Sequence, residues 1–240
     1  MTDADFSLWA YLSTSPLLWL TLTLAVWVAA DAASATLRRH PLANPVLLSI
    51  LAVAAVLAAS GTPYPTYFEG AQFIHFLLGP ATVALAVPLY RNRGLVRRRL
   101  LPIAAALVAG SLTAVASAVG IALLLGLAEP EVIAIAPKSV TAAIAMGISR
   151  ELGGEPALTA VLVILTGILG AVTVTPLMNA MGIRDYAARG FAVGLAAHGI
   201  GTARAFAVDG TAGTFAGIAM ALNAVLTAMI VPLILGLFGI

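Results

Sequence analysis

The sequence predicts an all-α integral membrane protein, a polytopic helical bundle of about six to eight transmembrane or re-entrant segments. Of its 240 residues, 61% are hydrophobic and only 9% are charged, whereas a soluble domain has roughly 25% charged residues. The mean hydropathy is +1.06, and apolar runs alternate with short polar loops. These observations exclude a soluble enzyme, a nucleic-acid-binding domain and a disordered linker protein.

Apolar segments of two lengths follow one another along the chain. The runs 45–60 and 138–149 are shorter than the about 20 residues that a spanning helix needs. We therefore expect half-helices or re-entrant segments there, and whether they cross or re-enter stays open. The longer runs are predicted to cross the bilayer, near 13–30, 71–90, 100–127, 157–178, 187–206 and 212–238.

The first long run is predicted to be a retained membrane helix. Its alanines within 29–33 resemble the cleavage region of a signal peptide. However, the stretch before it contains Asp3 and Asp5 and no lysine or arginine. A signal peptide has a positively charged leading region, so this stretch does not fit one.

Arginines predict the orientation in the membrane. Loops 31–43 and 91–99 contain arginines, whereas the charged residues of loops 61–70 and 127–136 are glutamates. The positive-inside rule places the arginine loops in the cytoplasm, which leaves the N-terminus outside. The absence of a transit segment rich in arginine and serine favours a bacterial inner (plasma) membrane, which the chain would cross several times.

Two parts of the chain resemble each other. Residues 77–95 align with residues 165–183 at a constant offset of 88, and the short runs 45–60 and 138–149 precede them. We therefore predict two repeats with broken helices, inverted if 138–149 crosses once and parallel if it re-enters. Inverted repeats with interrupted helices are typical of secondary transporters, whose site lies where the helices break. The identical pairs are Gly79 with Gly167, Pro88 with Pro176, Leu89 with Leu177 and Gly94 with Gly182.

These repeats divide a single predicted membrane domain. An N-terminal transmembrane helix and basic loop occupy 1–43, repeat 1 occupies 44–127, and repeat 2 occupies 128–240. In the alternative, the bundle has no repeats and the two short runs are ordinary core helices.

Lys138 is the only lysine in the sequence and follows Pro137 at the start of a short apolar run. An ammonium group in lipid costs at least about 2.5 kcal/mol, so it must pair, reach the interface or serve a ligand. We expect Pro137 at the first helical position, which places Lys138 beside the free N–H groups of that helix. Together with Ser139 and Thr141 nearby, the Lys138 ammonium and these N–H groups would suit a carboxylate ligand. In the alternative, Lys138 is an interfacial residue neutralised by a glutamate of loop 127–136.

A second polar cluster, from His198 to Arg204, interrupts an apolar stretch. Gly199 and Gly201 loosen a helix and let its backbone approach a ligand closely. His198 and Thr202 share one helix face, and the Arg204 guanidinium fits a carboxylate through two parallel hydrogen bonds. In the alternative, His198 joins helices and Arg204 caps a helix end. Coupling to a proton through His198 rests on residue type alone.

Three uncharged polar residues, Asn44, Thr82 and Asn223, are further candidates for contacting a ligand. Such residues more often join helices through hydrogen bonds. Glycines spaced four residues apart let helices pack closely, and two such pairs occur, Gly190 with Gly194 and Gly213 with Gly217.

Several chemistries are missing from the sequence. It has no cysteine, and His40, His75 and His198 are far apart. It also lacks a His-Glu-x-x-His pair, a Gly-x-Ser-x-Gly elbow and a phosphate-binding glycine loop. We therefore expect no metal, no cofactor, no catalytic residue and no enzymatic activity.

Four motifs in a fixed order resemble the LrgB/CidB family, from about residue 40 to the C-terminus. The motifs are LGPATVALAVPLY at 78–90, PKSVT at 137–141, LTAV at 158–161 and HGIGTA at 198–203. The family includes antiholin-like proteins named as regulators of murein hydrolases, and the plastidial glycolate/glycerate translocator is similar to it. Some bacterial members, with a small LrgA-type membrane partner, are linked to pyruvate uptake.

The resemblance implies a secondary transporter of small monocarboxylates or 2-hydroxy acids such as glycolate, glycerate or pyruvate. In the alternative, the protein is a holin-like or antiholin-like regulator of murein hydrolase activity and autolysis, without a substrate site. The resemblance places eight candidate substrate-binding residues on family motifs. Arg204 and Asn223 are two further candidates because of their side-chain chemistry. The eight are Asn44, Thr82, Lys138, Ser139, Thr141, His198, Gly199 and Thr202.

The expected partners follow from this interpretation. They are the lipid bilayer, the carboxylate substrate, a second copy of the chain and an LrgA-like small membrane protein, and they include no nucleic acid. We expect an elevator-type motion within a homodimer, because 240 residues are few for supplying both a moving bundle and a fixed scaffold.

Overall fold

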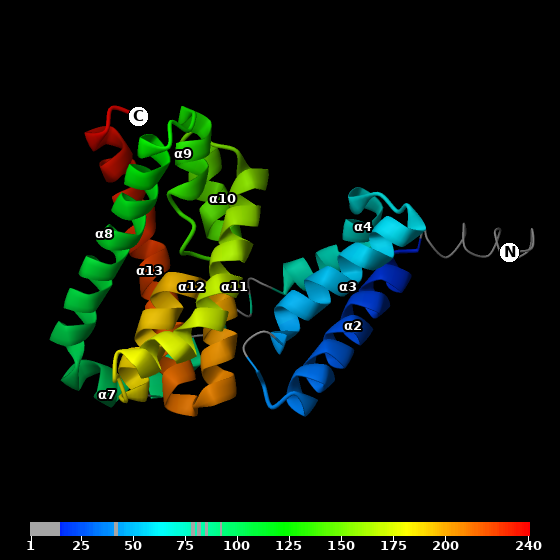
Figure 1. Ribbon diagram of the computed structural model, residues 1–240, viewed down its shortest axis with the longest axis horizontal. Coiled ribbons are helices and arrows are strands. Elements are labelled where there is room, and N and C mark those ends of the chain that lie inside the picture. The colour runs from blue at the N-terminus through cyan, green and yellow to red at the C-terminus, as the bar shows by residue number, and fades with distance from the viewer. Residues whose placement is uncertain (1–14, 41–42, 78–79, 81–82, 85, 92) are drawn as a thin grey trace, which may run out of the picture. The chain divides into compact units, whose positions relative to one another are not determined.

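The computed structural model describes residues 15–40, 43–77, 80, 83–84, 86–91 and 93–240. These residues form helices and no strand, which confirms the predicted all-α class. By length and composition, five of their helices are apolar enough to cross a membrane, and one of the five, Tyr186–Val208, folds back on itself as described below. The chain divides into two compact units, unit 1 (Met1–Ala84) and unit 2 (Leu85–Ile240), coloured blue to cyan and green to red in Figure 1.

The described residues of unit 1 form α2 (Pro16–Thr36), α3 (Pro45–Ser60) and α4 (Tyr64–Phe76). The predicted short run 45–60 is therefore one continuous helix. The predicted crossing 71–90 is not a single helix in the described residues, because α4 ends before Pro80, whose nitrogen has no hydrogen to donate. The crossing also includes residues 78, 79, 81, 82 and 85, which lie outside the description.

α2 and α4 pack closely at Gly70. A β-carbon at this glycine would lie 2.8 Å from the β-carbon of Trp19 in α2, so no larger residue fits. The Trp19 side chain is buried, and its ring meets that of Tyr67 edge to face with the centroids 6.1 Å apart. Thr23 and Tyr67 add a hydroxyl–hydroxyl hydrogen bond of 3.1 Å.

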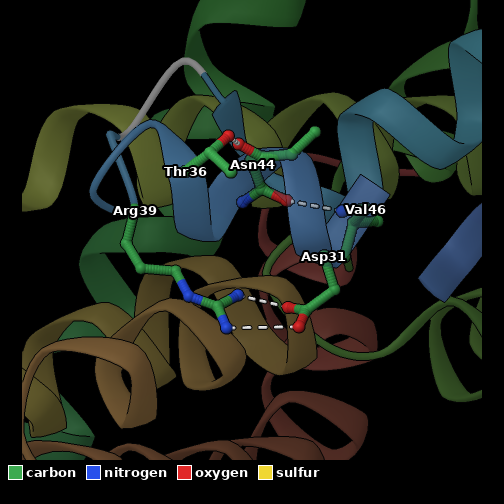
Figure 2. Close-up of polar contacts among 6 residues, drawn as sticks. Asp31, Thr36, Arg39, Asn44 and Val46 are labelled. Atoms are coloured by element: carbon green, nitrogen blue, oxygen red, sulfur yellow. Dashed lines mark hydrogen bonds and ion pairs between the residues drawn. The ribbon is translucent and has the colours of Figure 1, made fainter. Parts of the chain in front are cut away.

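Two polar contacts shape the connection between α2 and α3 (Figure 2). Arg39 donates hydrogen bonds to both carboxylate oxygens of Asp31, but both side chains are partly exposed, so this ion pair contributes little stability. Asn44 caps α3, since its side-chain oxygen accepts from the backbone N–H of Val46 at 2.8 Å and that of Leu47 at 3.4 Å. A cap of this kind is worth about 1 kcal/mol.

Three long helices run from one end of unit 2 to the other. They are α8 (Leu100–Leu124), α11 (Pro156–Ala180) and α13 (Gly210–Leu237). α8 and α13 are parallel, because residues near their beginnings share one hydrophobic cluster and residues near their ends share another. α11 runs in the opposite direction. We call the end where α8 begins the arginine end, after Arg99, and the other the glutamate end, after Glu129.

The first interruption of the helices lies between α9 (Glu129–Ile135) and α10 (Ala142–Glu151). The two short helices fold back on each other, because a β-carbon at Gly154, just beyond α10, would lie 2.7 Å from Ile133 of α9. We call residues 129–151 the first hairpin. It enters and leaves at the glutamate end (Figure 1), so the run 138–149 re-enters.

The prediction that Pro137 begins a helix was wrong. α10 begins at Ala142, so Pro137 and Lys138 lie in the tip of the first hairpin, residues 136–141. Pro137 has no N–H and cannot continue the hydrogen-bond ladder of α9. The chain turns there instead, with the N–H of Lys138 donating to the carbonyl of Ile135 at 3.1 Å and that of Val140 to the carbonyl of Pro137 at 3.2 Å.

The second interruption lies within α12 (Tyr186–Val208). Ala197 and His198 have non-helical backbone angles, and the φ of His198 is 41°. Such a positive φ costs a residue with a β-carbon of order 1–3 kcal/mol. The chain reverses here, because a β-carbon at Gly201 would lie 2.7 Å from the carbonyl oxygen of Val193. A straight helix would keep these two residues about 12 Å apart.

The two arms of α12 therefore run in opposite directions along α13. Successive residues of the first arm contact successively later residues of α13, so this arm is parallel to α13. The close packing predicted at the glycine pair Gly190 and Gly194 is therefore confirmed. Contacts of the second arm go backwards along α13, so that arm is antiparallel. These contacts are Gly190 on Ala212, Gly194 on Ala216, Thr202 beside Met220 and Phe206 on Gly213.

We call residues 186–208 the second hairpin. It enters and leaves at the arginine end, so the prediction that 187–206 crosses the membrane was wrong. The two hairpins thus enter unit 2 from opposite ends (Figure 1). Part of the aligned segment 77–95 lies outside the described residues, and the division into repeats stays a prediction.

Asn223 of α13 connects the tips of both hairpins. Its Nδ2 donates to the carbonyl oxygen of Ser139 in the first hairpin at 3.3 Å and to that of Leu195 in the second at 3.0 Å. Its Oδ1 accepts from the hydroxyls of Ser111 at 2.6 Å and Thr227 at 3.1 Å. An asparagine side chain has two donor hydrogens and two acceptor lone pairs, and all are used here.

The tip of the second hairpin rests on two glycines of α11. His198 Nε2 lies 2.9 Å from the carbonyl oxygen of Val163, and because a carbonyl only accepts, Nε2 carries the hydrogen. A β-carbon at Gly167 would lie 2.7 Å from the His198 ring. A β-carbon at Gly170 would lie 2.4 Å from the β-carbon of Ala197. The glycines therefore make room for the tip.

We expect Asn223→Ala to destabilise unit 2, because it leaves the carbonyls of Ser139 and Leu195 without the partner that Asn223 provides. Each buried carbonyl left unsatisfied costs about 1–3 kcal/mol. The measurement is the thermal midpoint of purified protein in detergent. The control replaces Asn179 by alanine, because this asparagine is exposed and its side-chain oxygen accepts, among the described residues, only from Arg189 at the surface. Equal midpoints for the two variants would contradict this function of Asn223.

We expect Gly167→Ala to displace the His198 ring from Val163 and to lower stability by about 1–3 kcal/mol through overpacking. Gly120→Ala in α8 is the control, since a β-carbon there meets nothing within 4 Å. Alanine favours helix over glycine, so this control should be neutral or slightly stabilising. The measurement is again the thermal midpoint of each variant. An unchanged midpoint in Gly167→Ala would show that the tip does not rest on α11 as described.

Candidate functional site

A cavity of about 760 Å³ lies beside the tips of the two hairpins. The first tip contributes Lys138 and Ser139, and the second contributes Leu195 and Ala196. α8 and α11 supply the remaining lining. The site is therefore built where both helical interruptions meet, which is where a transporter with broken helices binds its substrate. The lining from α8 and α11 is Ala109, Gly110, Thr113, Ala114, Thr166, Leu169, Gly170 and Thr173.

The Lys138 ammonium group is half-buried in this lining and lacks an anionic partner within the described residues. Its Nζ donates to the Ser139 hydroxyl at 3.3 Å. The ion pairs found there join Arg39 to Asp31 and Arg99 to Asp185. Glu131, a glutamate of loop 127–136, does not neutralise Lys138. The Glu131 carboxylate instead accepts a hydrogen bond from the backbone N–H of Ala128, at the start of its own helix, at 2.9 Å. The cavity therefore contains an uncompensated positive charge.

Three threonines give the cavity hydrogen-bond acceptors. Thr113, Thr166 and Thr173 each donate the hydroxyl hydrogen to the backbone carbonyl four residues earlier, at 2.7 Å in every case. With the hydrogen committed, each oxygen keeps lone pairs that accept hydrogen bonds. These acceptors suit the hydroxyl groups of a small organic acid, while the ammonium group suits its carboxylate.

Sequence reasoning missed these threonines. Thr166 and Thr173 are seven residues apart and so share a face of α11, which was a signal in the sequence. Thr113 lies on a different helix and gave no such signal. Threonine is also common in membrane helices, where it joins helices through hydrogen bonds, so only the tertiary structure separates these residues from the others.

Other predicted site residues lie in or next to the tips and outside the cavity lining. His198 and Thr202 are buried, and the Thr202 hydroxyl donates to the His198 carbonyl at 2.8 Å. Asn223 is occupied by the four hydrogen bonds described above. Gly199 begins the second arm of the second hairpin, and Thr141 is the residue before α10, with no side-chain capping bond.

The remaining predicted residues are not brought to this cavity by the described structure. Arg204 lines a small pocket at the arginine end with Tyr186 and Arg189. Asn44 belongs to unit 1 and caps α3. Thr82 lies outside the described residues. Of the ten predicted residues, Lys138 and Ser139 thus line the cavity.

Comparisons with known proteins agree with this description. The model of the LrgB-like family matches residues 23–237. The chain is 32% identical over 199 residues to a Staphylococcus epidermidis protein named "Holin-like protein CidB", covering 83% of this chain and 87% of that protein. It is 35% identical over 192 residues to the uncharacterized protein YwbG of Bacillus subtilis, covering 80% and 85%. An uncharacterized Haemophilus influenzae protein is 36% identical over 192 residues, covering 80% and 83%.

No solved structure matches the chain. The family match extends over both compact units, from within α2 through α3, α4 and the two hairpins of unit 2. The apolar helices and the named relatives make it a multi-pass membrane protein. The chain belongs to the LrgB-like family.

Proposed function

We propose that the protein is a secondary transporter of small monocarboxylates or 2-hydroxy acids, such as glycolate, glycerate or pyruvate. One observation carries the proposal. The only lysine of the sequence lies at the tip of an interrupted helix, in a cavity of about 760 Å³, without an anionic partner in the described structure. A charged group at such a position is expensive and is normally functional.

The binding mode follows from the donors and acceptors of the cavity. The Lys138 ammonium and the Ser139 hydroxyl would hold the carboxylate. The oxygens of Thr113, Thr166 and Thr173 would accept from the hydroxyl groups of a 2-hydroxy acid such as glycolate or glycerate, whereas pyruvate has no hydroxyl hydrogen to donate and would rely on its carboxylate. α10 begins three residues after Ser139, and the partial positive charge of its N-terminus favours an anion in the same region.

A second function is favoured by the name of a relative. The Staphylococcus epidermidis protein is called holin-like, and this name supports a holin-like or antiholin-like regulator of murein hydrolases more directly than it supports a carrier. Such a protein needs no substrate site, whereas the lone lysine and the acceptor-lined cavity need an explanation. The geometry therefore leads us to the carrier.

Several details of the proposal rest on sequence. An elevator-type motion, a homodimer, an LrgA-like small membrane partner and a bacterial inner membrane stay expectations. In either function the protein is proposed to act without enzymatic activity. The part that His198 plays in transport, including proton coupling, also stays a proposal.

We expect Lys138→Gln to weaken the saturable uptake of labelled glycolate, glycerate or pyruvate into proteoliposomes. A hydrogen bond to a charged group is worth about 1.5–3 kcal/mol, so KM should rise at least about tenfold. Lys138→Arg keeps the charge and should retain part of the uptake. Arg150→Gln, which removes an exposed cation at the end of α10, is the matched control and should transport normally.

Trapped-dye release from the same vesicles distinguishes the two functions. Saturable uptake without dye release supports the carrier. Dye release without saturable uptake, unchanged in Lys138→Gln, would reject the carrier and favour the holin-like function.

A further inference from the structure

A second hollow, an apolar groove of about 440 Å³, lies between α8 and the first arm of the second hairpin. Its walls include Pro102, Ile103 and Ala106 of α8 and Phe191 of α12, and Phe215 of α13 also contributes. Its polar lining residues, Arg99 and Asp185, lie at the arginine end. The groove therefore combines a hydrocarbon-like interior with a charged mouth.

The length of the groove matches half of a bilayer. Along α8 its lining extends from Arg99 to Gly110, which at the rise of an α-helix is about 16 Å. The hydrocarbon core of a membrane is about 30 Å thick, so one leaflet measures about 15 Å. A groove of this length could hold one acyl chain of a single leaflet.

The groove is closed at its inner end by Leu195. A β-carbon at Gly110 would lie 2.9 Å from one δ-carbon of Leu195 and 3.0 Å from the other, so the leucine side chain rests directly on this glycine. Gly110 and Leu195 also line the cavity of Lys138. Their contact therefore separates the apolar groove from the cavity that contains Lys138.

An ion pair lies at the mouth of the groove, and two further arginines precede it in the chain. Arg99 pairs with Asp185 at 3.0 Å. The N–H of Ala187, which donates to this carboxylate, and the Arg99 guanidinium hold the pKa of Asp185 below its usual value, so this pair is ionised near neutral pH. Arg97 and Arg98 lie in the last turn of α7 (Arg93–Arg98), immediately before Arg99, and are exposed. Figure 1 shows α7 at the start of α8.

We propose that this groove is a binding site for an anionic phospholipid of the leaflet at the arginine end. One acyl chain fills the groove down to Leu195, and the phosphate group lies beside Arg97 and Arg98. Arginine clusters at the cytoplasmic ends of membrane helices attract anionic headgroups, and basic pockets between such helices bind them. The positive charges of Arg97 and Arg98 would favour such a lipid over a zwitterionic one.

This site is independent of the carrier proposal, since it uses no residue of the cavity except the Gly110–Leu195 contact. The acyl chain would pack on the first arm of the second hairpin. Lipid binding should therefore stabilise the hairpin, and thermal unfolding measures that effect whether or not the protein transports anything.

The test uses full-length protein in a neutral detergent, titrated with phosphatidylglycerol or with phosphatidylcholine of the same acyl chains. We expect phosphatidylglycerol to raise the thermal midpoint more. Ala106→Phe fills the groove and should abolish the difference, with Ala188→Leu as a milder variant at the same groove. Arg97→Gln with Arg98→Gln should reduce the difference while leaving the Arg99–Asp185 pair intact.

Two controls make the result decisive. Ala105→Phe adds the same ring to an exposed position of α8 outside the groove lining, and Arg150→Gln removes a cation at the glutamate end. Both should respond to the lipids as the unmodified protein does. Equal responses to the two lipids, or a full phosphatidylglycerol response in Ala106→Phe and Ala188→Leu, would overturn the proposal. Loss of a dimer in Ala106→Phe, measured as molar mass, would assign the groove to a second copy and overturn it equally.

Discussion

Backbone groups freed inside an apolar helical unit must find partners, because lipid offers none. Unit 2 interrupts its helices twice, at 136–141 and at 197–198, and Asn223 meets this demand at both places. Its amide donates to a carbonyl of each tip while its oxygen accepts from hydroxyls of α8 and α13. A single side chain therefore connects two hairpins that enter from opposite ends, and the cavity lies beside their tips.

Glycine makes the second hairpin sterically feasible. The tip reaches α11 only because Gly167 and Gly170 have no side chains, and the first arm reaches α13 through Gly190 and Gly194. The unfavourable φ of His198 is maintained because its ring is hydrogen-bonded to α11 in the space left by these glycines. Close packing, and not helix propensity, thus stabilises a strained turn next to the site.

In unit 2 the cavity that contains Lys138 and the apolar groove are separate. On one side of the Gly110–Leu195 contact lies the cavity with the Lys138 ammonium, and on the other the groove that leads to Arg99. Leu195 precedes the break in α12 by two residues, and its carbonyl is bonded to Asn223. The same leucine therefore belongs to the wall between the hollows and to the network that joins the tips.

Composition and hydropathy were sufficient to predict a helical membrane protein and the short apolar segment 45–60, because these depend on local apolar content. They also made Lys138 a candidate, because lipid does not tolerate its charge. They led to the wrong topology for 187–206, because two half-length arms have the same length and hydropathy as one spanning helix. Whether such a segment crosses or folds back depends on contacts between residues distant in the sequence, here those of Asn223 and Gly167. Only the tertiary structure contains these contacts, and it therefore decided where Lys138 lies and which threonines surround it.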